Sequence, residues 1–82
     1  MPRETLDLSG VPCPANSARA LLYLEGMNSG SELKIIVDDG EPSLNLPDSL
    51  IGEGYTIIEK RRKGKKWIIL VRKNDELSKD LR

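Results

Sequence analysis

The sequence predicts a two-layer α/β sandwich in a single domain, with element order β-α-β-α-β-β and both helices on one face of a mixed four-stranded sheet. Two observations lead to this prediction. The spacing of apolar residues changes along the chain between the strand period of two and the helical period of about 3.6. Glycine-containing turns separate the segments. The 82 residues suffice for one domain, with a core over about residues 5–73 and a polar tail over 74–82.

The first half of the chain predicts a strand followed by a helix. "TLDLSG" alternates apolar and polar residues and ends at Gly10. Residues 14–27 have helical spacing, and Pro14 suits the first helical position, which places Cys13 at or next to the N-cap. Gly30 follows as a left-handed stop. The spacing predicts a buried helix face made of Ala18, Leu21, Leu22 and Met27, with Ala15 and Leu24 on its flanks.

The second half predicts a strand, a helix and a β-hairpin. "ELKIIVDD" (32–39) alternates as a strand, and "GEPS" reads as a turn. A shorter helix is expected over 44–53, with Pro47 at its start or in its first turn. Strands over 55–62 and 66–73 are joined by a tight "KGK" connection. The sheet face away from the helices is expected to carry Glu32, Lys34, Ile36 and either Thr56 or Trp67.

Composition limits the chemistry available to the chain. It has one cysteine and no histidine, which excludes an internal disulfide and gives no basis for a metal site. The first residues, "MPRETLDLSG", lack the apolar core of a signal peptide, and the longest apolar run, "WIILV", is too short to span a bilayer. Basic and acidic residues balance at 13 each. We expect a monomeric, cytoplasmic protein that does not bind membranes.

The lone cysteine, Cys13, has two interpretations. It is either a small buried hydrophobic residue or an activated nucleophile. Pro12 and Pro14 restrict the backbone on both sides, and a helix N-terminus favours the thiolate. Without a histidine or a second cysteine, neither a protease dyad nor an internal dithiol cycle is available. What remains is single-thiol chemistry that accepts a group and passes it on; a peroxide-sensing thiol lacks a resolving cysteine.

Charged residues gather in two places. Asp38, Asp39 and Glu41 are interpreted as turn residues. A basic stretch near the end either consists of solvated charges that protect an edge hairpin, or docks an acidic partner or RNA phosphates. Trp67 could stack on a base, but the scarcity of aromatic residues favours its packing on the sheet. The basic residues are Lys60, Arg61, Arg62, Lys63, Lys65 and Lys66.

The chain resembles the TusA (SirA-like) sulfurtransferase family. Leu6, Asp7 and Gly10 match its Leu-Asp-x-x-Gly motif, and Cys13 and Pro14 match the start of its Cys-Pro-x-Pro motif. "MNSGSEL" and "VDDGEP" extend the likeness, which covers about residues 5–73. The resemblance implies a small sulfur carrier. Its cysteine receives persulfide sulfur from a cysteine desulfurase or another sulfurtransferase, relays it to an acceptor protein, and needs no cofactor beyond this transient sulfur.

One motif position departs from the family pattern. Asn16 stands where the second proline of Cys-Pro-x-Pro is expected. We expect its side chain to hydrogen-bond a nearby backbone group or the sulfur-bearing residue. The variant motif resembles a distinct branch of the family, so the acceptor need not belong to tRNA thiolation, and direct tRNA binding is not expected to be the primary role.

Two functions of different classes therefore remain open. In the leading hypothesis, Cys13 carries persulfide sulfur, with Asp7, Gly10, Pro12, Pro14 and Asn16 as supporting motif residues. In the alternative, the chain is a non-catalytic binding module that docks RNA or an acidic protein through the hairpin at 60–66, and Cys13 only packs. Replacing Cys13 by serine separates them, because only the first function requires the thiol.

Overall fold

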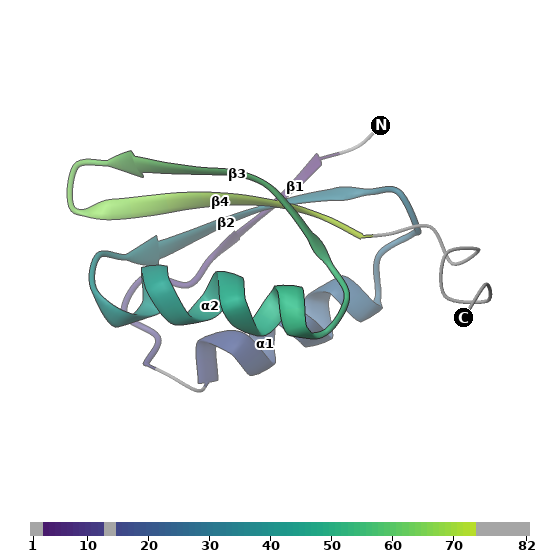
Figure 1. Cartoon of the computed structure of the whole chain (residues 1–82), viewed down its shortest axis with the longest axis horizontal. Helices are drawn as coiled ribbons and strands as arrows, with labels where there is room; N and C mark the ends of the chain where they lie inside the picture. The colour runs from purple at the N-terminus through teal and green to yellow at the C-terminus, as the bar shows by residue number, and fades with distance from the viewer. Residues whose placement is uncertain (1–2, 13–14, 74–82) are drawn as a thin grey trace.

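Four strands form one sheet, and both helices cover the same face of it (Figure 1). The computed structural model describes residues 3–12 and 15–73. The predicted fold class and element order are confirmed. The elements are β1 (Arg3–Asp7), α1 (Ala15–Glu25), β2 (Glu32–Asp38), α2 (Glu41–Gly52), β3 (Thr56–Lys63) and β4 (Lys66–Arg72).

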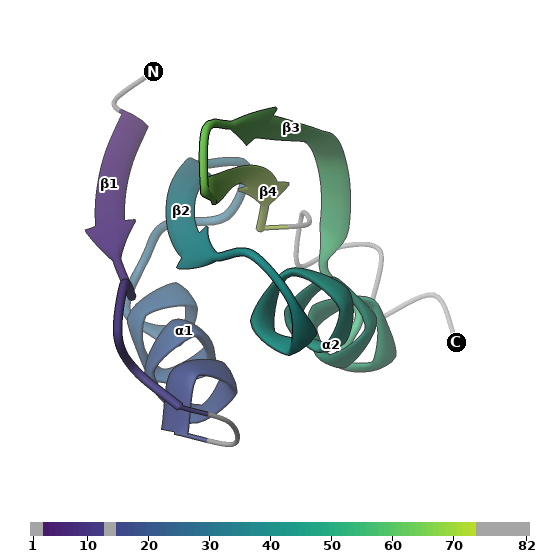
Figure 2. The ribbon, with the colours of Figure 1, turned by 90° about the vertical axis from the view of Figure 1, so that its left-hand side faces the viewer.

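The sheet is mixed, with strand order β1-β2-β4-β3. β1 and β2 are parallel, whereas β4 runs antiparallel to both of its neighbours, β2 and β3. Because β1 and β2 are parallel, their carboxyl ends lie at the same end of the sheet. The antiparallel pairing of β4 brings its first residues to that end as well (Figure 2). The loop toward Cys13, the β2–α2 turn and the β3–β4 hairpin therefore come together.

Strand register assigns every second residue to one of two faces. On the helix side, Leu33, Ile35 and Val37 of β2 are fully buried, as are Ile69 and Val71 of β4. The alternate residues of these strands point to the opposite face. Trp67 pairs with Val37 and packs against the core, so it lies on the helix side and not on the outer face, where Thr56 is found.

The buried face of α1 differs from the predicted one. Ala18 and Leu22 are exposed, with Leu22 at 70%. The stripe that faces the core consists of Asn16, Ala20 and Leu24. These three residues are four apart and so share one face of the helix. The prediction was wrong for Ala18 and Leu22, because Asn16, a polar residue, begins the buried stripe and conceals its period. It is confirmed for Met27, which is buried, and for Leu21, which packs against the core.

Helix α2 begins at Glu41 instead of Leu44, so "GEPS" is part of its start and not a separate turn. Gly40 is the N-cap at φ 101°, and its carbonyl accepts bonds from the backbone N–H of Ser43 (3.1 Å) and the Ser43 hydroxyl (2.7 Å). Pro42 fits the first turn, where no N–H is needed. Pro47 is buried inside the helix, not in its first turn, and cannot donate the usual bond to the carbonyl of Ser43.

The β3–β4 hairpin has the predicted tight connection. Lys63 pairs with Lys66, which leaves Gly64 and Lys65 as a two-residue turn. Gly64 adopts φ 64°, a left-handed conformation that two-residue hairpins require at their first turn position. A register shift between Ile57 and Glu59 marks a bulge near the start of β3.

Truncation of the α1 stripe should destabilise the fold strongly. Leu24→Ala removes a fully buried side chain, so we expect the free energy of unfolding to fall by about 2–5 kcal/mol, measured by urea denaturation. Leu22→Ala, on the same helix but 70% exposed, should change it by less than about 0.5 kcal/mol. Equal losses in the two variants would contradict the observed orientation of α1.

Candidate functional site

The loop that leads toward Cys13 is a tight turn anchored on the sheet. The N–H of Leu8 donates to the carbonyl of Ile36 (2.8 Å), which extends the β1–β2 pairing past the end of β1. The N–H of Val11 donates to the carbonyl of Leu8 (3.1 Å) and closes the turn. Gly10 adopts φ 77° at its third position, where a type II turn requires a left-handed residue. This conformation accounts for the glycine of the motif.

Asp7, the last residue of β1, stabilises the same turn through a hydrogen bond. Its Oδ1 accepts the N–H of Ser9 (2.9 Å), the local bond by which aspartate commonly shapes turns. Hydrogen bonding by Ser9 lowers the pKa of Asp7 below its ordinary value. Asp7 and Gly10, two of the predicted supporting residues, thus have a shared task in shaping the loop.

Asp38, at the end of β2, joins this loop to the hairpin. Its Oδ2 accepts the N–H of Gly10 (2.6 Å), and its Oδ1 lies 2.9 Å from Nζ of Lys66. The Lys66 ammonium, followed by the Gly10 N–H, lowers the pKa of Asp38, so the side chain stays ionised further into acid than a free aspartate. The sequence predicted only a turn residue at Asp38. Its link between the loop and the hairpin could not be predicted, because both hydrogen-bond partners are 28 positions away.

Asn16 lies in the first turn of α1. Its N–H donates to the carbonyl of Pro12 (3.1 Å), the i to i−4 bond of an α-helix. Pro12 and Asn16 thus stand on either side of Cys13 and Pro14, which lie outside the described residues, as does the predicted N-cap. This bond places the loop end and the start of α1 in fixed relation.

The side chain of Asn16 is fully buried, which is unusual for an amide. Its Oδ1 accepts the N–H of Ser17 at 2.6 Å. Its Nδ2 has no hydrogen-bond partner among the residues described. A buried donor left unpaired costs free energy, so Nδ2 of Asn16 is free to donate to a group that is not among the described residues.

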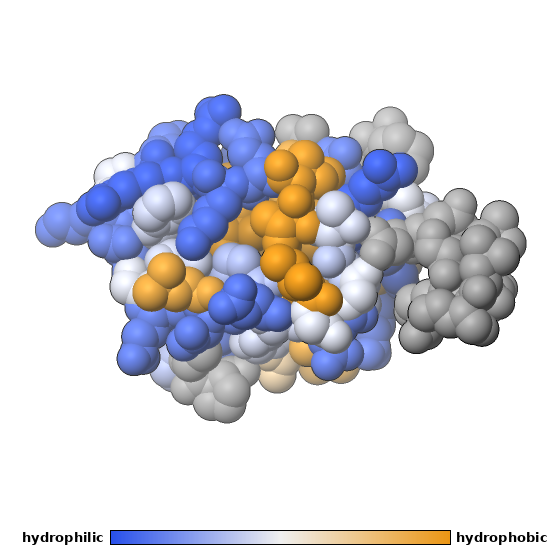
Figure 3. Space-filling model, viewed as in Figure 1, coloured by the Kyte–Doolittle hydropathy of each residue, from blue (hydrophilic) through white to orange (hydrophobic). Residues whose placement is uncertain are grey.

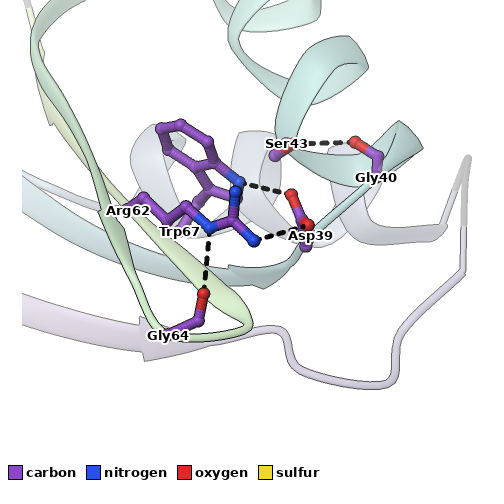
Figure 4. A network of polar contacts seen from close by, with 6 residues as sticks. All are labelled: Asp39, Gly40, Ser43, Arg62, Gly64 and Trp67. Carbon is purple, nitrogen blue, oxygen red and sulfur yellow. Dashed lines mark hydrogen bonds and ion pairs between the residues drawn. The ribbon is translucent and has the colours of Figure 1, made fainter.

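Asp39 forms a second polar cluster beside Asp38 (Figure 4). Its Oδ1 accepts Nε1–H of Trp67 at 2.7 Å, and its Oδ2 lies 3.4 Å from Nη2 of Arg62. Arg62 also donates from Nε to the carbonyl of Gly64 (3.0 Å). The Trp67 bond, aided by the charge of Arg62, lowers the pKa of Asp39. This cluster fixes the hairpin to the β2–α2 turn.

The basic hairpin does not form one surface. Hydrophilic side chains crowd this end of the molecule (Figure 3), but strand alternation divides them between two faces. On the helix side, Lys60 lies 4.9 Å from the ring centre of Trp67, and Arg62 binds Asp39. Arg61, Lys63 and Lys66 point to the outer face, where Arg61 pairs with Glu59 at 2.8 Å. Lys65 is in the turn.

The described residues contain neither a candidate metal site nor a candidate membrane-spanning helix. Within residues 3–12 and 15–73, no group of three or more cysteine, aspartate or glutamate residues could hold a metal ion. Neither α1 nor α2 is long and apolar enough to cross a membrane.

Comparison with known proteins identifies relatives over nearly the whole chain. The family model described as "Sulfurtransferase TusA" matches residues 4–73. A putative sulfur carrier protein of Archaeoglobus fulgidus is 35% identical over 71 residues, covering 85% of this chain and 81% of the relative. The crystal structure of a SirA-like protein from Desulfitobacterium hafniense superposes with a TM-score of 0.73 at 24% identity, covering 88% of this chain and 99% of the other. That structure supports the fold.

The Asp39 cluster should be sensitive to acid. Trp67 is the only tryptophan, so its emission reports on the bond to Asp39. Because folding lowers the pKa of Asp39, its contribution to stability is complete above the ordinary carboxyl pKa and is lost as the pH falls through the lower folded value. We expect an emission change with a midpoint below 3.8, before the helical circular dichroism is lost.

Asp39→Asn should remove this acid transition, whereas Asp48→Asn, at an exposed position of α2, should leave it in place. An unchanged transition in Asp39→Asn would show that another group controls the emission.

Proposed function

Because the chain belongs to the TusA sulfurtransferase family, we propose that it is a sulfur carrier whose Cys13 accepts persulfide sulfur and relays it to an acceptor protein. One observation carries this proposal. The family match covers residues 4–73, and the only cysteine of the chain lies in it, at the Cys-Pro motif. The Archaeoglobus relative bears the name of a sulfur carrier, which supports the same role.

The proposed reaction needs a single thiol. The Cys13 thiolate attacks the outer sulfur of a persulfide on the donor protein. A new S–S bond forms at Cys13, the donor's S–S bond breaks, and its electron pair leaves with the donor thiolate, so no external oxidant or reductant is consumed. A nucleophile on the acceptor then takes the outer sulfur in the same way. A cysteine desulfurase or another sulfurtransferase is the proposed donor class.

The geometry around the loop supports this chemistry. Bonds from the ends of β1 and β2 hold the turn at Ser9 and Gly10 directly ahead of Cys13. Because the turn before Cys13 is already ordered, less conformational entropy is lost when a partner protein aligns with the thiol. The start of a helix also supplies N–H donors and a partial positive charge, which favour a sulfur anion.

We assign the unpaired Nδ2 of Asn16 to this sulfur. The amide is fully buried, its Nδ2 has no partner among the described residues, and Asn16 follows Cys13 by three positions in the sequence. A hydrogen bond to a sulfur anion would satisfy the donor and stabilise the thiolate or persulfide. In this proposal, Asn16 replaces the backbone restraint of the family's second proline with a direct polar contact.

Mass spectrometry tests the carrier function. After incubation with a cysteine desulfurase and cysteine, the intact protein should gain one sulfur atom, about 32 Da, that dithiothreitol removes, as expected for a persulfide on a reactive thiolate. Cys13→Ser should gain none. A wild-type protein that gains no sulfur from several donor enzymes would overturn the proposal.

The role of Asn16 is tested by the reactivity of the thiol. Asn16→Leu removes the amide but keeps the same branched heavy-atom skeleton, so alkylation of Cys13 by iodoacetamide at neutral pH should slow by about threefold to tenfold, because the thiolate is the nucleophile. Asn45→Leu, at an exposed position of α2, should react like the wild type. An unchanged rate in a folded Asn16→Leu variant, verified by circular dichroism, would show that Asn16 does not act on the sulfur.

A further inference from the structure

The outer face of the sheet is uncovered in the part of the chain that the structure describes. Both helices lie on the other face, as the two perpendicular views show (Figures 1 and 2). Strand register places Lys34 and Ile36 of β2 beside Leu70 and Ile68 of β4 on this outer face. An α/β layer with one open face either meets solvent through polar residues or meets another molecule.

The centre of this face is apolar. Ile36 pairs directly with Ile68, and Leu70 follows two positions further along β4. All three side chains are only partly buried, although they occupy the two central strands. A contiguous aliphatic strip on central strands is typical of a surface that a partner covers.

Lysines surround one end of this strip. A groove of about 450 Å³ is lined by Lys34, Ile36, Lys63, Lys65, Lys66 and Ile68. No carboxylate lines it. Lys66 shares the carboxylate of Asp38, whereas Lys34, Lys63 and Lys65 form no ion pair with any described residue. The groove therefore has an aliphatic floor and a positive rim, and of its lysines only Lys66 has a carboxylate partner among the described residues.

We propose that this groove binds an acidic amphipathic helix of a partner protein. Such a helix would place an aliphatic stripe on Ile36 and Ile68 and its flanking carboxylates against the lysines. The complementary charges would favour rapid association and fix the orientation of the helix.

The chemistry of the groove favours a protein over RNA. Recognition of single-stranded RNA relies on aromatic rings that stack on bases. The chain has one tryptophan, two tyrosines and no phenylalanine. Trp67 lies on the helix side of the sheet, Tyr23 of α1 donates to Glu4, and Tyr55 packs against the core. An aliphatic floor gives RNA nothing to stack on, but it suits leucine or isoleucine side chains.

The groove adjoins the candidate sulfur site without being part of it. Lys66 lines the groove and contacts Asp38, and the same carboxylate holds the N–H of Gly10 in the loop before Cys13. A partner seated in the groove would therefore lie next to that loop. The proposal does not depend on sulfur transfer, since binding can be measured with Cys13→Ser.

Fluorescence anisotropy with a labelled peptide tests the groove. The probe is a synthetic helix of about 18 residues, five turns, with leucines on one face and glutamates on the other. We expect saturable binding that Lys63→Glu weakens by about tenfold, because a rim charge is reversed. Arg19→Glu, an equal charge reversal at an exposed position of α1, should weaken it by less than about twofold.

The apolar floor is tested with a second pair of variants. Ile36→Thr keeps a β-branched residue in β2 but removes aliphatic surface from the groove, and should weaken binding about fivefold. Ile51→Thr, at an exposed position of α2, is the matched control. Amide chemical shifts in the NMR spectrum should change at Lys34, Ile36, Lys63 and Ile68.

Three results would overturn the proposal. The first is no binding up to about 1 mM peptide. The second is equal weakening by Lys63→Glu and Arg19→Glu, which would indicate unspecific charge attraction. The third is tighter binding of a single-stranded RNA of the same net charge that displaces the peptide and is not weakened by Ile36→Thr, which would identify a phosphate-binding surface instead.

Discussion

The carboxylate of Asp38 is the interaction on which the candidate site depends. One oxygen accepts the N–H of Gly10 and the other lies against Lys66, so a single side chain links the cysteine loop, β2 and β4. Parallel pairing of β1 and β2 makes this possible, because it brings the end of β2 beside the turn that leaves β1. The lowered pKa of Asp38 means that this link persists to a lower pH than the ordinary carboxyl pKa would allow. The shape of the loop thus rests on the sheet and not on local sequence alone.

Much of the fold follows from residue spacing, since the alternation between strand and helix periods predicts six elements in the observed order. The errors arose where tertiary structure overrides local pattern. A polar residue, Asn16, begins the buried stripe of α1, so apolar spacing alone wrongly included Ala18 and Leu22 in the buried face. Pro47 sits inside α2 although proline usually ends helices, and the register that turns Trp67 toward the helices depends on pairing with β2.

The candidate site was only partly predictable for the same reason. The Asp-x-x-Gly motif and the family resemblance identified the loop residues, and Cys13 remains a prediction because it lies outside the described residues. Proximity along the chain suggested one basic patch, but alternate residues of a strand face opposite ways. Arg62 therefore binds Asp39 on the helix side, while Lys63 borders the outer groove. The bonds from Asp38 and Asp39 to the hairpin span 23 to 28 positions, and no local pattern reveals them.

The two proposals together assign different tasks to different surfaces. A carrier must present the same cysteine first to a donor and then to an acceptor. A partner whose only contact was with the thiol would therefore block the next exchange for as long as it stayed bound. A groove on the outer face of the sheet allows recognition away from the thiol, with Asp38 and Lys66 as the physical connection between the two surfaces. An acidic partner that competes with Asp38 for the Lys66 ammonium would also weaken one restraint on Asp38, and through it on Gly10.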